Sequence, residues 1–96
     1  MDRSSDEYYH GLEERLGSLS PQIRALVSSE LADWYEEYVA VGEYGLAIEV
    51  ISEVLTPDMP ADVTQPLGEG LLSEAELMGL TGATVSRLRA LARERP

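Results

Sequence analysis

The sequence predicts an all-α fold: a small single domain of four to five helices built round a long antiparallel α-hairpin of residues 21–55. Apolar side chains recur at steps of three and four residues in each long segment, which is the spacing of a helix face. Residues with capping chemistry separate these segments. The length suits one domain, residues 1–96, with the ends 1–5 and 94–96 expected to fray.

The most apolar stretch, Tyr44 to Leu55, is expected to be the central helix. Only Glu49, Ser52 and Glu53 interrupt its apolar side chains, and a helix that is apolar on most sides is buried. The stretch is rich in β-branched residues, so a buried strand is the competing interpretation. Its length and the capped helix before it favour a helix.

The helix before it is expected to begin at Ser20, a serine N-cap followed by proline, and to end at Gly42. Its core-facing stripe is predicted to consist of Ile23, Val27, Leu31, Trp34, Tyr38 and Val41. Trp34 is therefore expected in the core. Tyr35 falls near the edge of the stripe and is expected to be exposed.

The second half of the chain is expected to be less regular. Residues 57–70 hold three prolines and two glycines and are predicted to form an ordered crossing loop, a kind of segment that is often functional. Ser73 is predicted to open a short helix, with Glu76 completing a capping box. A last helix is expected to start near residues 81–84.

Charge is the strongest compositional feature. Eighteen acidic residues face seven arginines, there is no lysine, and the net charge is −11. No cationic residue lies between Arg24 and Arg87, yet twelve carboxylates do: Glu30, Asp33, Glu36, Glu37, Glu43, Glu49, Glu53, Asp58, Asp62, Glu69, Glu74 and Glu76. Internal pairing with arginine is not expected over most of that length. Such a surface either keeps the protein soluble or meets a basic partner, and it repels nucleic acid and anionic membrane.

Several classes of function find no support. The chain has no cysteine and a single histidine, His10, so thiolate or multi-histidine metal sites are not expected. No phosphate loop, calcium loop or nucleophile constellation occurs, so we expect neither an enzyme nor a bound cofactor or metal. No apolar run approaches the ~20 residues of a membrane span, and no signal peptide is visible, so a cytoplasmic protein is expected.

Residues 74–91 resemble a DNA-binding helix-turn-helix motif. The positions that carry the likeness are Ala75, Gly79, Leu80, Val85 and Leu88, with Thr84, Ser86 and Arg87 in outward positions. The pattern is mostly a packing code for two helices that meet across a glycine turn, and acidic residues lead into it. A DNA-binding regulator is kept as an alternative function.

A second resemblance covers more of the chain. The segment Gly42–Glu49, the hydrophobic run through Leu55 and Met78-Gly79-Leu80 resemble the MafI-like immunity proteins, which are small, acidic, largely helical antidotes of bacterial polymorphic or contact-dependent toxins. A single tetratricopeptide half-repeat looks similar to the first segment, but one such unit does not make a repeat protein.

The resemblance implies a protein that binds a cognate toxin domain with a basic surface, commonly a ribonuclease. An acidic face would imitate the phosphate that a nuclease holds and would steer association. The candidate partner-binding residues are Asp33, Tyr35, Glu36, Glu37, Glu43, Tyr44, Glu49 and Glu53. A generic acidic adaptor or anti-activator is the other alternative, and the oligomeric state is left open.

Overall fold

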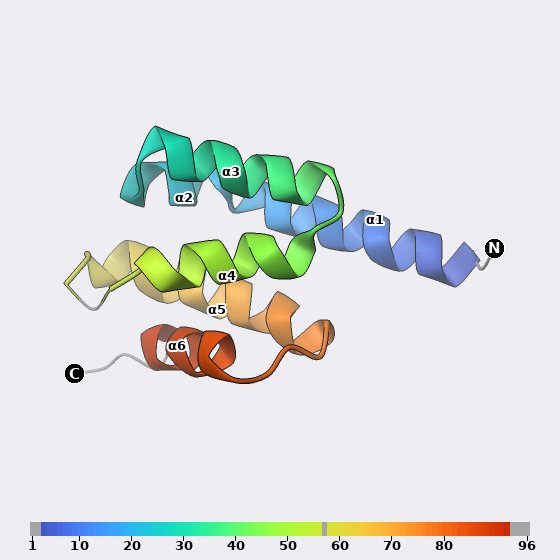
Figure 1. Ribbon diagram of the computed structural model, residues 1–96. Helices are drawn as coiled ribbons and strands as arrows, with labels where there is room; N and C mark the ends of the chain where they lie inside the picture. The colour runs from blue at the N-terminus through green and yellow to red at the C-terminus, as the bar shows by residue number, and fades with distance from the viewer. Residues whose placement is uncertain (1–2, 57, 93–96) are drawn as a thin grey trace.

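The computed structural model describes the backbone of residues 3–56 and 58–92, and the side chains from residue 9 onward. The described residues form helices and no strand, so the all-α prediction is confirmed (Figure 1). In chain order the helices are α1 (Arg3–Ser18), α2 (Ser20–Leu26), α3 (Ser29–Ala40), α4 (Tyr44–Val54), α5 (Ala61–Leu77) and α6 (Ala83–Ala92). Of the ends expected to fray, 1–5 and 94–96, residues 3–5 belong to α1, and residues 1–2 and 94–96 lie outside the described residues.

The hairpin of α3 and α4 is closed by a glycine turn, as predicted. Gly42 has φ +84°, a left-handed conformation that glycine adopts without strain. The backbone N–H of Glu43 donates to the carbonyl oxygen of Tyr38 at 2.8 Å, and that of Gly42 donates to Val39 at 3.2 Å. This pair of bonds is the Schellman motif, which fixes where α3 ends and where Glu43 lies.

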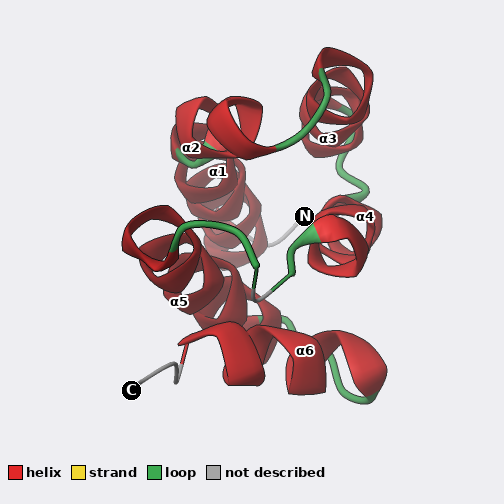
Figure 2. Cartoon of the chain, turned by 90° about the vertical axis from the view of Figure 1, so that its left-hand side faces the viewer, coloured by secondary structure: helices red, strands yellow, loops and turns green. Residues whose placement is uncertain are grey.

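The central position of residues 44–55 is also confirmed. Helix α4 packs against α3, α5 and α6 and buries Ala47, Ile48 and Ile51 completely (Figures 1 and 2). One side of α4 nevertheless faces solvent, where Leu46 is 45% exposed. The helix is therefore central without being enclosed on every side.

The continuous helix expected between Ser20 and Gly42 is divided. Val27 is extended (φ −117°, ψ 171°), and the hydroxyl of Ser28 accepts a hydrogen bond from the backbone N–H of Leu31 as the N-cap of α3. The break resets the helical phase. Beyond it, the core-facing residues of α3 are Ala32, Tyr35 and Val39.

The expectations for Trp34 and Tyr35 were consequently wrong. Trp34 is 50% exposed, and Tyr35 is fully buried. A stripe continued from Ile23 without a break would have put Trp34 inside. The break at Val27 and Ser28 rotates α3, so that Tyr35 enters the core in place of Trp34.

The crossing loop predicted at residues 57–70 was wrong as well. Its described part from Ala61 onward is the first half of α5, with Pro66 inside the helix. Ser73 lies in the middle of α5 and caps nothing. The helix forms because it buries side chains and one glycine at helical spacing: Thr64, Leu67, Gly68, Leu71, Glu74 and Ala75. Tertiary burial on this scale outweighs the local cost of a helical proline.

Candidate functional site

An open groove lies between α3 and α4 near their connecting turn. Its volume is about 400 Å³, and it is lined by Trp34, Glu37, Tyr38, Val41, Glu43 and Leu46, which we call the α3–α4 groove. Trp34, Val41 and Leu46 are 50%, 65% and 45% exposed, and they are three of the five large hydrophobic side chains exposed in the described part of the chain. Gathered apolar exposure of this kind is typical of an interaction site.

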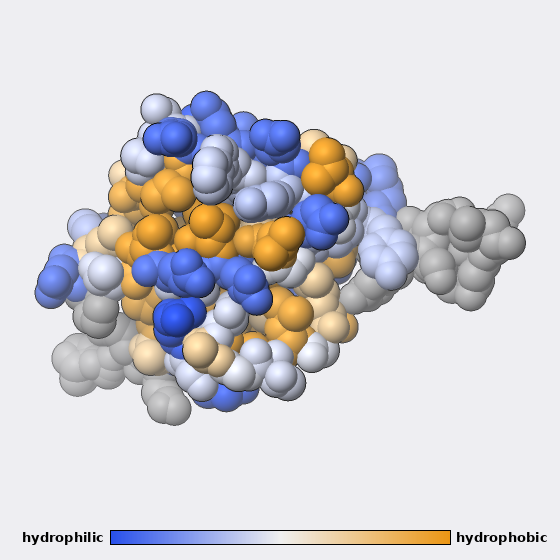
Figure 3. All heavy atoms as spheres, in the orientation of Figure 1, coloured by the Kyte–Doolittle hydropathy of each residue, from blue (hydrophilic) through white to orange (hydrophobic). Residues whose placement is uncertain are grey.

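Two apolar stripes extend this surface along the hairpin. One stripe consists of Trp34 and Tyr38 of α3 and Val41, the residue that caps its end. The other lies on α4, where Leu46, Val50 and Val54 are four residues apart each time. Figure 3 shows this face, with a hydrophobic band along α4 between hydrophilic atoms over the outer edge of α3 and below α4. Helix α3 is thus apolar on two sides, of which the core uses only one.

Four of the predicted partner-binding carboxylates accompany the band. Glu37 and Glu43 line the groove, and Glu49 and Glu53 lie one helical turn apart on α4. All four are exposed, and none forms an ion pair with a described cation. Their negative charge therefore reaches the solvent uncompensated by a direct partner.

Asp33 and Glu36, also predicted to bind the partner, are instead engaged within the chain. The Arg24 guanidinium donates through Nη2 to Asp33 Oδ1 at 2.5 Å and through Nε to Glu36 Oε2 at 2.9 Å. The hydroxyl of Ser20 also donates to Glu36. The hydrogen bond from Arg24, followed by that from Ser20, lowers the pKa of the Glu36 carboxyl. These two carboxylates link α3 to Arg24 of α2, and both remain exposed.

The expected lack of arginine partners holds over most of the acidic span, but four of its twelve carboxylates are paired. Besides the two held by Arg24, Glu74 is paired with Arg15 at 2.9 Å and Glu76 with Arg89 at 3.1 Å. All three arginines lie outside the span in sequence, and helix packing brings them to it. The eight carboxylates without an ion pair to a described cation are Glu30, Glu37, Glu43, Glu49, Glu53, Asp58, Asp62 and Glu69.

The two predicted aromatic contacts are packing residues. Tyr35 donates its hydroxyl to the backbone oxygen of Leu16 at 2.6 Å, and burial, followed by the nearby Glu74 charge, raises the pKa of its phenol. Tyr44 is 8% exposed and stacks on Tyr9 with ring centroids 6.3 Å apart; burial also raises its pKa. The aromatic residues that this face presents are the exposed Trp34 and the half-buried Tyr38.

The helix-turn-helix pattern proves to be a packing arrangement of α5 and α6. Gly79 closes α5 with φ +78°, and the backbone N–H of Leu80 donates to Ala75 at 3.0 Å. Val85 and Leu88 are buried as predicted. Thr84, predicted to point outward, is buried as well, whereas Ser86 and Arg87 are exposed.

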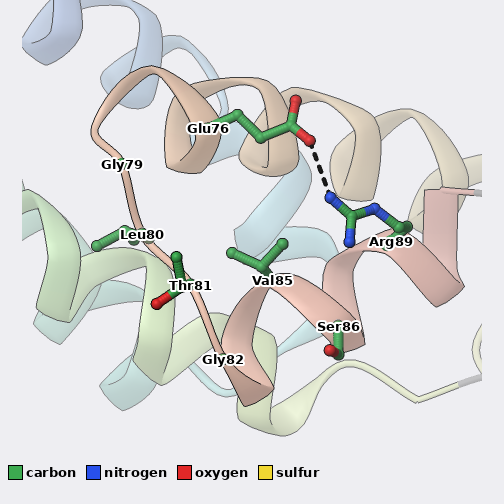
Figure 4. Close-up of a pocket in the computed structure, with 8 residues that line it drawn as sticks. All are labelled: Glu76, Gly79, Leu80, Thr81, Gly82, Val85, Ser86 and Arg89. Carbon is green, nitrogen blue, oxygen red and sulfur yellow. Dashed lines mark hydrogen bonds and ion pairs between the residues drawn. The ribbon is translucent and has the colours of Figure 1, made fainter.

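A second cavity, of about 360 Å³, lies at this turn (Figure 4). Figure 4 shows Glu76 of α5 and Arg89 of α6 reaching toward each other across it, joined by their ion pair, with Val85 beneath. The charged groups that line this cavity therefore satisfy one another. They leave little unpaired charge for a ligand.

Among the described residues there is no group of three side chains able to hold a metal ion. None of the described helices has the length and apolar character needed to cross a membrane. Comparison of the chain with protein-family models, curated proteins and solved structures finds no match. Both family resemblances therefore stay predictions.

Proposed function

We propose that this chain is an immunity protein that binds and neutralises a cognate toxin domain with a basic surface. The proposed toxin is a nuclease, in particular a ribonuclease, and the proposed place of action is the cytoplasm. The α3–α4 groove and the carboxylates beside it are the proposed binding surface. The resemblance of Gly42–Glu49 to MafI-like immunity proteins supports the class of function.

The observation that carries this proposal is the composition of the α3–α4 groove. It combines an exposed tryptophan and two exposed aliphatic side chains with two carboxylates that have no ion-pair partner among the described residues. Exposed aromatic residues that become enclosed by a partner carry much of the affinity of protein interfaces. The adjoining charge selects which partner can approach.

Charge narrows the class of partner. Nucleic acid and anionic membrane are repelled by a chain with net charge −11. A second copy of this chain seated on the same groove would place Glu37 and Glu43 against like charges, which costs several kcal/mol, about the range seen for like-charge juxtaposition at interfaces. A basic protein surface has the opposite sign and is attracted from a distance.

A nuclease offers such a surface because it must hold the phosphates of its substrate. Carboxylates placed over that surface satisfy the same basic side chains and exclude the nucleic acid. Complementary charge also speeds encounter, which benefits an antidote that must reach its toxin before the substrate does.

The proposal is tested by co-expression with the C-terminal domain of the protein encoded by the neighbouring gene. Cells that carry both should survive, and the two chains should elute together in size-exclusion chromatography. A Glu37→Lys/Glu43→Lys variant that keeps its helical circular-dichroism spectrum should fail to protect. Equal cell death with and without this chain, and no complex in vitro, would sink the immunity proposal and favour an acidic adaptor.

DNA binding through residues 74–91 gains less support. The recognition-like helix α6 keeps Arg87 exposed, but Arg89 is paired with Glu76. The described part of α6 thus offers one arginine without an ion pair, which does not compensate for the net charge of the chain.

A further inference from the structure

We propose that the α3–α4 groove receives an arginine side chain of the partner, with its guanidinium on the Trp34 ring and paired with Glu37 or Glu43. This rests on the proposed function only for the identity of the partner protein. The choice of arginine comes from the chemistry of the groove.

The lining contains two kinds of group that one occupant must satisfy together. Trp34, Val41 and Leu46 gain from losing contact with water, whereas Glu37 and Glu43 lose their hydration when the groove is covered. An aliphatic plug would leave two carboxylates desolvated without a partner, which is costly. A cation on an apolar stem suits both kinds of group.

The groove is largely preformed. Trp34 and Glu37 are three residues apart on α3, so they are neighbours on one helix face. Glu43 comes from the other side of the turn, where its backbone N–H is bonded to Tyr38 at 2.8 Å. The backbone that carries these side chains is therefore fixed before binding, so only side-chain freedom is lost, which favours affinity.

Arginine fits better than lysine. Its guanidinium is planar, stacks on an aromatic face and donates two parallel hydrogen bonds to one carboxylate. It is also less strongly hydrated than an ammonium group, so it enters a partly apolar groove at lower cost. Cation–π attraction is strongest on tryptophan.

The first experiment uses short synthetic peptides as probes at low ionic strength. One peptide carries two arginines between glycines, and matched peptides carry lysine or citrulline in their place. Trp34 is the only tryptophan in the chain, so its fluorescence reports directly on the groove. The arginine peptide should change the emission saturably and bind about two- to fivefold more tightly than the lysine peptide. The citrulline peptide should give no saturable change.

Variants then distinguish binding in the α3–α4 groove from general attraction by the negative charge of the chain. Glu37→Gln and Glu43→Gln should each weaken the arginine peptide several-fold, whereas Glu69→Gln on α5 makes the same charge change at an exposed carboxylate outside the groove and should have a much smaller effect. The Trp34→Leu and Trp34→Phe variants lack the fluorescent side chain, so their peptide binding is measured by two-dimensional NMR. Trp34→Leu should remove the preference for arginine over lysine, and Trp34→Phe should keep part of it.

Equal binding of the arginine and lysine peptides, or an equal loss in Glu37→Gln and Glu69→Gln, would overturn the inference in favour of diffuse attraction. A toxin complex that survives Trp34→Leu unchanged would overturn it too and leave the proposed function standing. Conversely, groove-specific arginine binding without any toxin complex would remove the proposed function and keep the inference.

Discussion

The hydroxyl of Tyr35 lies 2.6 Å from the backbone oxygen of Leu16, to which it donates a hydrogen bond, and both side chains are fully buried. This contact ties α3 to the end of α1. Because Tyr35 faces inward, its neighbour Trp34 faces outward and becomes part of the α3–α4 groove. The same contact that anchors the fold thus presents the proposed binding surface.

Substitutions at these two neighbours should have opposite profiles. Tyr35→Phe removes one buried hydrogen bond and should lower the free energy of unfolding by about 0.5–1.5 kcal/mol, and Tyr35→Ala should cost about 3–5 kcal/mol through lost packing. Trp34→Ala should cost less than Tyr35→Ala, about 1–2 kcal/mol, because half of the Trp34 side chain is already exposed. Urea unfolding followed by circular dichroism measures all three. A larger loss at Trp34 than at Tyr35 would show that Trp34, and not Tyr35, belongs to the core.

The orientation of α3 was the main feature that sequence alone did not reveal. Its two apolar stripes share one helix, and the choice between them depends on the break at Val27 and Ser28, which resets the phase. Ser28 has the chemistry of an N-cap, so a signal for the break was present. The serine–proline pair at Ser20 is a stronger start signal, and from it the apolar spacing predicts one continuous helix.

Other features were readable. The Gly42 turn, the burial of α4 and the carboxylates Glu37 and Glu43 at the surface follow from local chemistry and charge pattern. Helix α5 was missed because prolines and glycines dominate the local signal around Pro66. The apolar spacing that determines this helix runs through both the loop predicted at residues 57–70 and the short helix predicted from Ser73.

A second prediction concerns the ion pair between α1 and α5. Glu74 is only 8% exposed, and Arg15 Nε donates to both of its carboxylate oxygens at 3.0 and 2.9 Å. Arg15→Met should therefore cost about 1–3 kcal/mol, less than the about 3–5 kcal/mol of a fully buried pair, because Arg15 is half exposed. The double variant Arg15→Met/Glu74→Met should recover much of that loss. Urea unfolding of the unmodified chain, the two single variants and the double variant completes this double-mutant cycle. Strictly additive losses of unfolding free energy would show that Arg15 and Glu74 are not coupled.

Close approach of α5 and α6 gives a third prediction. A Cβ added at Gly68 would lie 3.1 Å from the Cβ of Leu91 and 3.4 Å from the backbone nitrogen of Ala92, so α6 would have to shift. Gly68→Ala should destabilise by up to about 2 kcal/mol even though alanine favours helix, because overpacking costs about 1–3 kcal/mol and the gain in propensity offsets only about 1 kcal/mol of that cost.

Gly70→Ala is the matched control for this change. Its added Cβ would meet only the end of the Leu19 side chain, at 3.2 Å. That side chain can move, so we expect a neutral or stabilising effect. Thermal unfolding distinguishes the two variants, and equal effects would contradict a tight α5–α6 contact.

The helix-turn-helix pattern should not bind DNA. Electrophoretic mobility shifts with random duplex at low salt should show no complex at micromolar protein, because the net charge is −11 and Arg89 is already paired with Glu76. A salt-dependent complex that Arg87→Ala abolishes would instead favour the regulator alternative.

The last prediction concerns association with the proposed basic partner. If unpaired carboxylates steer it, the association rate should fall markedly as salt rises, since the Debye length shortens from ~30 Å at 0.01 M to ~8 Å at 0.15 M. Glu49→Lys/Glu53→Lys should weaken binding and leave the helical fold intact, because both side chains are exposed on α4 beside the apolar band.

The control for that variant is Glu14→Lys/Glu69→Lys, which makes the same change in net charge on α1 and α5. It should slow association through the altered overall field and leave dissociation unchanged. Reversal at Glu49 and Glu53 should slow association further and also speed dissociation if either contacts the partner, with about 2–5 kcal/mol lost where a carboxylate pairs with a buried cation. Stopped-flow rates for both variants, compared with the unmodified chain across salt concentrations, decide the matter. Identical rates in the two variants would show that α4 is not part of the interface.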